Sequence, residues 1–306
     1  MAKAIRISGK AQPKAARSSG TSLPEKGIAL PRSRNVPSKN FHDYVVCIFG
    51  EKSVGKTSLC AQFPNALVEQ WEKGRLHLPI YQIPQKGEPA LTWPRHLKYM
   101  DLLLESEFKT VIQDTIDRCY ESCILHYCKE RGFKHPNDAN DYGKTWQESR
   151  QYFADSMELF NQAGKRLVFT SHAKLKEITT KTGRVYEMVV PTCSNQAWEY
   201  LKEVADFMIY YGYHGSERSF TIRGSDSCAA ACGPDNVFLD PDGNQLVEFP
   251  AGNSPKEAYD NLLAGFSNKL YGYPVDEEES EDEDDSSESE NGKSTTKVSI
   301  PKKKGR

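Results

Sequence analysis

The sequence predicts an α/β protein with a mainly parallel central sheet flanked by helices, β-hairpins toward the C-terminus and disordered tails. Short β-rich apolar runs alternate with helical stretches across residues 41–272, a pattern typical of parallel strands joined by helical crossovers. Two runs contain an acid near their carboxyl end, the edge where such sheets gather reactive side chains. A glycine-rich segment joins the first run to the first helix. We therefore place one domain at 41–272, between tails at 1–40 and 273–306.

The glycine-rich segment at residues 50–57 fits the pattern GxxxxGK(S/T). A buried strand is predicted before it, over residues 44–49, and a helix after it, over residues 57–63, which Pro64 closes. Strand, glycine-rich loop and helix in this order distinguish a phosphate-binding loop from a chance match. The segment is thus predicted to bind the phosphates of a nucleotide.

The chemistry of such a loop accounts for its spacing. Gly50 and Gly55 allow the backbone to curl so that its N–H groups point at phosphate oxygens. Lys56 can reach the β- and γ-phosphates, and the Thr57 hydroxyl can ligate Mg²⁺. The predicted cofactors are ATP and Mg²⁺, and the predicted nucleotide-binding residues are Gly50, Glu51, Lys52, Ser53, Val54, Gly55, Lys56, Thr57 and Ser58.

The strand predicted over residues 65–74 contains the first acid of interest, Glu72. An acid at the carboxyl edge of a sheet is well placed to orient or deprotonate an attacking water molecule. The alternative for Glu72 is an ordinary surface carboxylate.

The second acid, Asp114, follows a β-branched run. Residues 75–93 are broken by prolines, and an amphipathic helix is predicted over residues 95–107. Residues 108–117 then predict a strand that includes Asp114. Downstream of a phosphate loop, this acid is predicted to hold Mg²⁺ directly or through a water molecule.

Two amphipathic helices, at 117–130 and 145–163, are predicted around a polar loop at 136–144. The first helix carries Cys119 and Cys123 on one face. Because the sequence has no CxxC pair and no matching second half, a packed helix face is favoured over a zinc site.

The apolar run at residues 166–172 ends in Thr-Ser-His. His172 is therefore predicted at the carboxyl edge of the sheet, where it can sense the γ-phosphate, and a hydrogen-bonded structural histidine is the alternative. Residues 174–190 alternate around a Lys-Thr-Gly-Arg turn, which predicts a hairpin that could project toward DNA or a neighbouring subunit.

Two arginines follow the next predicted hairpin. Arg218 and Arg223 could each reach a γ-phosphate as a finger, in cis or in trans, and the alternative is a solvated hairpin arginine. The remaining predicted elements are, in order, a helix at 195–203, a strand at 205–211, that hairpin turning at 214–217, a further hairpin at 236–250 and a helix at 255–270.

The net charge of -2 conceals three blocks of charge. Residues 1–40 carry +8, residues 276–290 carry -11 and residues 291–306 carry +6. A nucleic-acid site must therefore be a local patch of the domain or lie in the tails. The first block predicts a disordered basic arm, which contacts nucleic-acid phosphates or is merely solvated. The acidic block predicts a disordered tail, which docks on a basic groove or only keeps the protein soluble.

The sequence has no apolar run of the roughly 18 residues that a membrane span needs, and its basic start lacks an apolar signal region. Its eight cysteines are scattered. We therefore expect a reduced, cytoplasmic protein with no membrane contact.

Four segments together resemble the phage-encoded RecA-like P-loop ATPases, some of which act in single-strand annealing and recombination. They are GEKSVGKTSLCAQFPNALVEQWEKG from Gly50, TVIQDTIDR from Thr110, YGKTW from Tyr142 and VFTSHAK from Val168. The resemblance covers about residues 40–235. The phosphate loop alone is generic, whereas its combination with FP-x-AL-x4-EKG and the later Thr-Ser-His is more specific.

The resemblance implies a RecA-like core in which Glu72 activates water, Asp114 is the second acid and His172 couples the γ-phosphate to DNA. Arg218 stands where the family carries a basic residue after its late hairpin. The chain departs from the family at Gln113, where an aliphatic residue is usual, and at 228–234, where relatives often have an arginine. The expected catalytic residues are therefore Glu72, Lys56, His172 and Arg218.

The resemblance also implies an ATPase of phage recombination or replication, located in the host cytoplasm. Its expected partners are single-stranded DNA, a single-stranded-DNA-binding protein or recombinase, and further copies of itself. The alternative is a catalytically weak, ATP-gated mediator that recruits such a protein. A GTPase or small-molecule kinase is disfavoured because the sequence lacks an NKxD base reader and an arginine-rich lid.

Overall fold

The computed structural model describes residues 32–73 and 77–271. The predicted basic arm and C-terminal tail fall largely on residues 1–31 and 272–306, which lie outside the described residues, so those two predictions are not tested. Residues 1–39 form a separate unit, whose described part contains no helix or strand. The folded elements all belong to the second unit, which begins at Asn40.

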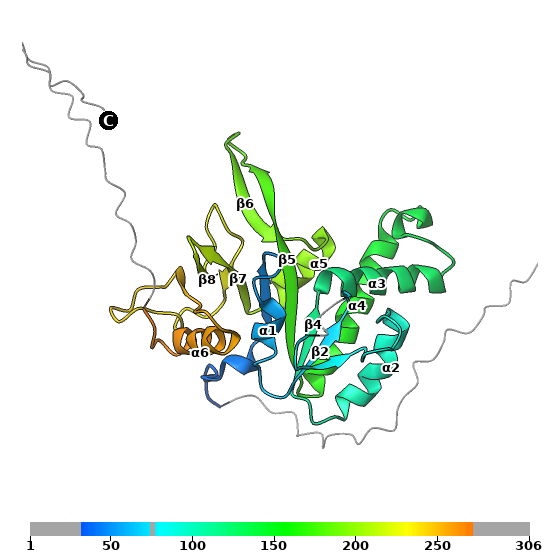
Figure 1. Ribbon diagram of the computed structural model, residues 1–306. Helices are drawn as coiled ribbons and strands as arrows, with labels where there is room; N and C mark the ends of the chain where they lie inside the picture. The colour runs from blue at the N-terminus through cyan, green and yellow to red at the C-terminus, as the bar shows by residue number, and fades with distance from the viewer. Residues whose placement is uncertain (1–31, 74–76, 272–306) are drawn as a thin grey trace, which may run out of the picture. The chain divides into compact units, whose positions relative to one another are not determined.

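Six parallel strands form the centre of the sheet, and antiparallel strands extend one edge (Figure 1). In spatial order the parallel strands are β7 (Phe207–His214), β1 (Val46–Gly50), β5 (Arg166–Thr179), β4 (Thr110–Asp114), β2 (Ala66–Gln70) and β3 (Tyr81–Ile83). Beyond β7 lie β8 (Glu217–Thr221) and β10 (Glu248–Pro250), and the short β9 (Ala231–Cys232) also pairs with β7. Because β5 lies between β1 and β4, the carboxyl ends of β1 and β4 lie on either side of β5 in the middle of the sheet.

Helices cover both faces of the sheet and bury two separate cores. Four of them pack on one face: α2 (Trp93–Leu104), α3 (Ile116–Glu130), α4 (Lys144–Gln162) and α5 (Asn195–Val204). On the other face lie α1 (Lys56–Cys60) and α6 (Pro255–Phe266). Within β1, Cys47 and Phe49 face the first core, whereas Val46 and Ile48 face the second. The predicted α/β class, a mainly parallel sheet flanked by helices, is confirmed.

Several predicted boundaries are wrong. The helix after the glycine-rich loop is only Lys56–Cys60, and the second strand ends at Gln70, so that Glu72 lies beyond it. The proline-broken stretch contains the edge strand β3. The last predicted hairpin keeps its turn at residues 240–243, but its second arm, β10, pairs with β8 because Phe249 packs on Phe220.

The predicted hairpin at 174–190 is present and continues the central strand β5 without interruption. Strand β6 (Val185–Pro191) pairs with the second half of β5, and Figure 1 shows the two strands rising beyond the rest of the sheet. Two apolar side chains on them are exposed, Leu175 at 63% and Val185 at 55%. The hairpin is therefore available for contact with another molecule.

Short 3₁₀ helices, η1 (Phe41–Asp43) and η2 (Pro136–Ala139), complete the described fold. Within the described ranges, every helix is too short or too polar to span a bilayer.

Candidate nucleotide-binding site

The glycine-rich loop adopts a conformation that its glycines make possible. Gly50 ends β1, and a Cβ atom there would lie 1.9 Å from the carbonyl oxygen of Tyr211 on β7. Gly55 caps α1 in the left-handed region, with φ of 111°. Ser53 also has a positive φ of 67°. The loop thus turns back tightly over the carboxyl end of β1, as the sequence predicted.

A cavity of about 160 Å³ opens over this loop. Five of the predicted nucleotide-binding residues line it: Ser53, Gly55, Lys56, Thr57 and Ser58. Glu51 and Lys52 are exposed outside the cavity, and Val54 is buried in the core beneath the loop. His77 and Leu78 form another part of the cavity wall. They come from the proline-broken stretch, which offered no signal of a role.

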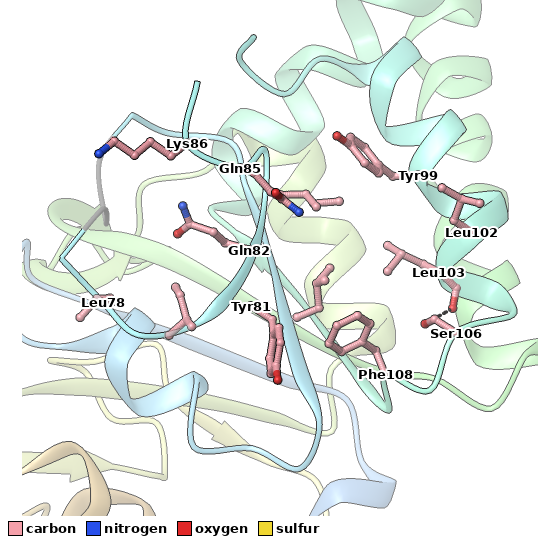
Figure 2. Close-up of a pocket in the computed structure, with 13 residues that line it drawn as sticks. Leu78, Tyr81, Gln82, Gln85, Lys86, Tyr99, Leu102, Leu103, Ser106 and Phe108 are labelled. Atoms are coloured by element: carbon pink, nitrogen blue, oxygen red, sulfur yellow. Dashed lines mark hydrogen bonds between the residues drawn. The ribbon is translucent and has the colours of Figure 1, made fainter. Parts of the chain in front are cut away.

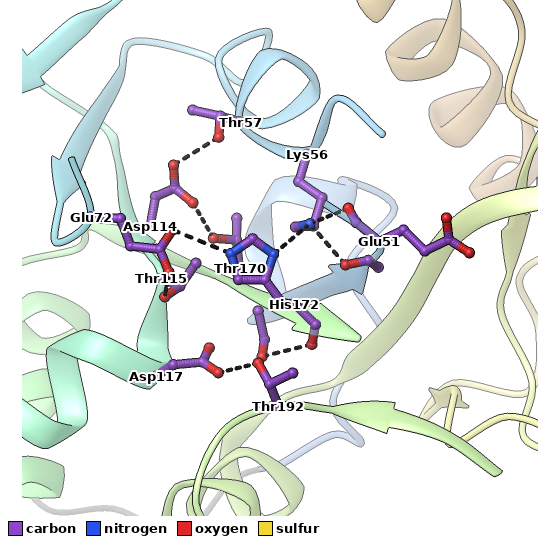
Figure 3. A network of polar contacts seen from close by, with 12 residues as sticks. Glu51, Lys56, Thr57, Glu72, Asp114, Thr115, Asp117, Thr170, His172 and Thr192 are labelled. Carbon is purple, nitrogen blue, oxygen red and sulfur yellow. Dashed lines mark hydrogen bonds and ion pairs between the residues drawn. The ribbon is translucent and has the colours of Figure 1, made fainter. Parts of the chain in front are cut away.

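Lys56 is almost completely buried, and its ammonium group is folded against the loop (Figure 3). The Nζ atom donates to the carbonyl oxygens of Gly50 at 2.9 Å and Glu51 at 2.7 Å. It also lies 3.5 Å from Nδ1 of His172. The positive charge is thus held at the mouth of the loop, beside the strand that carries His172.

Thr57 and Asp114 meet as the sequence predicted. The Thr57 hydroxyl donates to Oδ2 of Asp114 at 2.7 Å, and Thr170 donates to Oδ1 at 2.6 Å. Thr170 stands directly opposite Asp114 because β5 pairs with β4 in register. A buried carboxylate beside a hydroxyl is an oxygen donor set suited to Mg²⁺, so these residues fit the cation that the motif implies. Thr170 itself was not predicted.

Glu72 and His172 also meet, although Glu72 follows β2 and His172 lies within β5. The Nε2 atom of His172 lies 3.2 Å from Oε2 of Glu72, and Thr115 donates to Oε1 at 3.1 Å. Because a carboxylate only accepts, His172 donates from Nε2 and is left to accept from Lys56 at Nδ1. Figure 3 shows the imidazole between the ammonium and the carboxylate. The result is a continuous line from the phosphate loop to Glu72.

The structure does not bring the two predicted arginines to this cluster. Arg218 lies on β8, two strands away from β1, and donates to the carbonyl oxygen of Asn253 at 3.1 Å. Arg223 follows the antiparallel β8 and donates to the carbonyl oxygen of Val237. It lies about 16 Å along the chain from Arg218, toward the amino ends of the parallel strands. Neither of these contacts involves Lys56, Glu72 or His172, and a finger role for either arginine, in cis or in trans, stays a prediction.

The cysteines that flank the loop are part of the core. Burial raises the pKa of the Cys47 and Cys60 thiols, so both stay protonated at neutral pH. Cys119 and Cys123 on α3 are buried as well, as a packed helix face requires. Within the described ranges, no group of three or more His, Cys, Asp or Glu residues is placed to hold a metal ion.

Two larger cavities lie outside the phosphate loop. One, of about 540 Å³, has Glu72 and His172 in its wall together with residues of α3 and Trp146. The other, of about 460 Å³, is an apolar groove between β3 and α2 (Figure 2). Figure 2 shows Tyr99 and Leu103 on one side of this groove and Tyr81 on the other. The first cavity is continuous with the cluster, whereas the second opens at the edge of the sheet.

Residues 42–231, more than half of the chain, match the family model of the AAA domain (AAA_24). The chain belongs to this AAA domain family. The matched range holds the glycine-rich loop, both acids and His172, so the polar cluster lies within the AAA domain. No curated protein matches the sequence significantly.

Among solved structures, this AAA domain protein is similar to a KaiC-like protein from the hyperthermophilic archaeon Pyrococcus horikoshii. The two chains are 11% identical, with a TM-score of 0.39. The alignment covers 70% of this chain and 87% of the other.

Proposed function

We propose that this protein binds ATP with Mg²⁺ and hydrolyses it at the cluster over the glycine-rich loop. One observation carries the proposal: Lys56, His172 and Glu72 stand in an unbroken line, with contacts of 3.5 and 3.2 Å. Phosphate binding, charge neutralisation and water activation need such groups within a few ångströms of one another. They come from three separate elements: Lys56 begins α1, Glu72 follows β2, and His172 lies within β5.

The loop residues act on the phosphates. Incoming phosphate oxygens compete with the Gly50 and Glu51 carbonyls for the Lys56 ammonium, which then neutralises charge on the transferring group. Thr57 and Asp114 would hold Mg²⁺, which would supply further positive charge. Thr170 keeps the Asp114 carboxylate in its orientation by donating to its second oxygen.

Glu72 acts on water. Its carboxylate accepts from Thr115 and from His172, so it is held ready to accept a proton from an attacking water molecule. His172 touches both the phosphate-binding lysine and this carboxylate. A change in Lys56 on nucleotide binding therefore reaches Glu72 through one imidazole ring, which is how His172 would sense the γ-phosphate.

We further propose single-stranded DNA as the partner of the β5–β6 hairpin, in phage recombination or replication. The hairpin region carries exposed cations, Lys174, Lys176, Lys181 and Arg184. Aromatic rings lie near two of them: Lys176 lies 5.9 Å from the centroid of Trp198 on α5, and Arg184 lies 5.8 Å from that of Tyr186 on β6. Cations and aromatic rings together are what single strands bind.

The second candidate is a weak ATPase that acts as an ATP-gated mediator, recruiting a single-stranded-DNA-binding protein or recombinase. It is favoured by the engagement of Arg218 with the Asn253 carbonyl, which leaves the transition-state charge to Lys56. Under the leading proposal, an arginine from a second copy in a homo-oligomer would complete the site.

The first test is phosphate release from ATP and Mg²⁺, with and without single-stranded DNA, for the wild type and Lys56→Ala. We expect turnover in the wild type, stimulation by DNA, and loss of both in the variant. Nucleotide binding without turnover under either condition would favour the mediator. Turnover that DNA leaves unchanged would remove the support for a DNA partner.

The second test concerns the hairpin. We expect the double variant Lys176→Gln, Lys181→Gln to bind an oligonucleotide more weakly, with a shallower dependence of log K on log salt, by about 1–2. The control is Lys256→Gln on α6, which removes a cation from a different element. Equal losses in both proteins would mean that the hairpin is not the DNA surface.

A further inference from the structure

A polar network is buried on the face of the sheet opposite the glycine-rich loop. Its centre is Glu69 on β2, which is fully buried in the core formed with α2 and α3. Nδ1 of His96 on α2, also fully buried, lies 2.8 Å from Oε1 of Glu69. A carboxylate without partners would be very costly at this position, so its donors decide whether the site is stable.

Gln113 supplies the second donor. Its side-chain amide donates to Oε2 of Glu69, which stands directly opposite it in the parallel β2–β4 pair. The amide oxygen of Gln113 accepts in turn from the indole N–H of Trp71 at 2.7 Å. Gln113 thus joins a buried acid to an aromatic ring at the end of the neighbouring strand.

Trp71 stands between this network and the proposed water-activating acid. Its backbone N–H donates to the carbonyl oxygen of Asp114 at 2.8 Å, and Glu72 is the next residue. Its ring stacks on Trp93 with a centroid distance of 6.1 Å, and His96 lies 5.5 Å away. With its indole and backbone both held, Trp71 leaves Glu72 little freedom where the strand has already ended.

We propose that Gln113 and Trp71 are positioning residues that fix Glu72 over the phosphate loop, anchored by the Glu69–His96 pair to α2. The proposal rests on the hydrolysis proposed above. The carboxamide of Gln113 donates to Glu69 and accepts from Trp71, which an aliphatic side chain cannot do. An aliphatic side chain would have been enough for packing alone.

The kinetic test compares Trp71→Phe with Trp93→Phe. Both remove an indole N–H from the same aromatic stack, but only Trp71 is bonded to Gln113 and adjacent to Glu72; the Trp93 N–H faces the Tyr152 hydroxyl at 3.4 Å. For Trp71→Phe we expect kcat to fall about tenfold or more while KM for ATP stays within about twofold. For Trp93→Phe we expect both constants to stay within about twofold. Equal effects of the two substitutions, or an unchanged kcat in Trp71→Phe, would overturn the proposal.

A spectroscopic measurement separates this inference from the hydrolysis itself. The chain has four tryptophans, so a ¹H–¹⁵N spectrum of the full-length protein resolves few indole signals, and each substitution identifies its own. We expect the Trp71 signal to shift on addition of a non-hydrolysable ATP analogue while the Trp93 signal stays in place. Absence of wild-type turnover would end the hydrolysis proposal, yet a shifted Trp71 signal would still support its link to the nucleotide. An unmoved Trp71 signal would refute the positioning role even in an active enzyme.

Discussion

At the scale of single residues, the two acids of the site differ in the chemistry of the donors that contact them. The Asp114 carboxylate accepts from two hydroxyls, and the Glu72 carboxylate accepts from one hydroxyl and one imidazole. The two hydroxyls on Asp114 are neutral donors, which a cation can replace. Glu72 is instead coupled to a group that itself touches the phosphate-binding lysine. The two carboxylates are thus suited to different tasks, one to the metal and one to water.

Glu72→Gln tests this division. Glutamine keeps the shape of the side chain but is a much weaker base, so we expect turnover to fall about 10²–10⁴-fold. ATP binding, measured by calorimetry, should change little because the loop contacts remain. The control is Glu121→Gln, an exposed acid on the wall of the same larger cavity that pairs with Arg118. Substantial turnover in Glu72→Gln, or an equal loss in the control, would contradict the assignment.

The sequence revealed only part of this residue-level arrangement. Thr57 and Asp114 were predictable from local patterns. The loop pattern places Thr57 at the start of the first helix, and an acid after a β-branched run is expected at the carboxyl end of a strand. Glu69 and His96 were not, because an acid within an apolar strand has no partner in the sequence; its donors come from another strand and from α2. Arg218 was expected both from its place after a predicted hairpin and from the resemblance, and the Asn253 carbonyl that it contacts could not be read from the sequence.

At the scale of elements, a small contact fastens the last helix to the start of the sheet. His42 in η1 lies 2.8 Å from the Tyr259 hydroxyl of α6, and its ring stacks on that of Tyr259. Phe41 beside it packs on Phe207 and Phe266. Burial, followed by the nearby Arg166 guanidinium, lowers the pKa of His42. The folded protein therefore favours the neutral imidazole.

This lowered pKa predicts the direction of a pH dependence. Because the unfolded chain binds the proton more readily, the contribution of His42 to stability is present above its unfolded pKa of about 6.5 and is lost as pH falls below it. We expect the free energy of unfolding in urea to decline between pH 7 and pH 5.5. The decline should be smaller in His42→Gln. The same substitution at His126 on α3 is the control, and an equal change there would assign the effect elsewhere.

The elements also differ in how well the sequence predicted them. Helices α3, α4 and α5 were placed within one residue at each end because their apolar spacing is regular over ten residues or more. Strand β3 was missed because it is only three residues long and is surrounded by prolines. The pairing of β10 with β8 was missed because a hairpin is the shortest connection, whereas the apolar contact of Phe249 lies across the sheet.

At the scale of the whole molecule, the class was predictable and the order of the strands was not. Continuous apolar runs predict strands buried on both faces, hence a parallel sheet between helices. Nothing in those runs says that β5 lies between β1 and β4. Yet this order places Thr170 beside Asp114 and His172 beside Lys56. The site is thus a consequence of topology, which depends on interactions over the full length of the domain.

Strand β5 has a further consequence, because one unbroken strand serves both the site and the hairpin. From His172 to the end of the strand at Thr179, the chain extends by about 23 Å. Reciprocity of linked equilibria applies to its two ends. If a molecule bound at the hairpin raises the affinity for nucleotide by some factor, bound nucleotide must raise the affinity for that molecule by the same factor. Titrating nucleotide with and without the hairpin ligand, and the hairpin ligand with and without nucleotide, would therefore measure the same coupling free energy. The two measured values must agree.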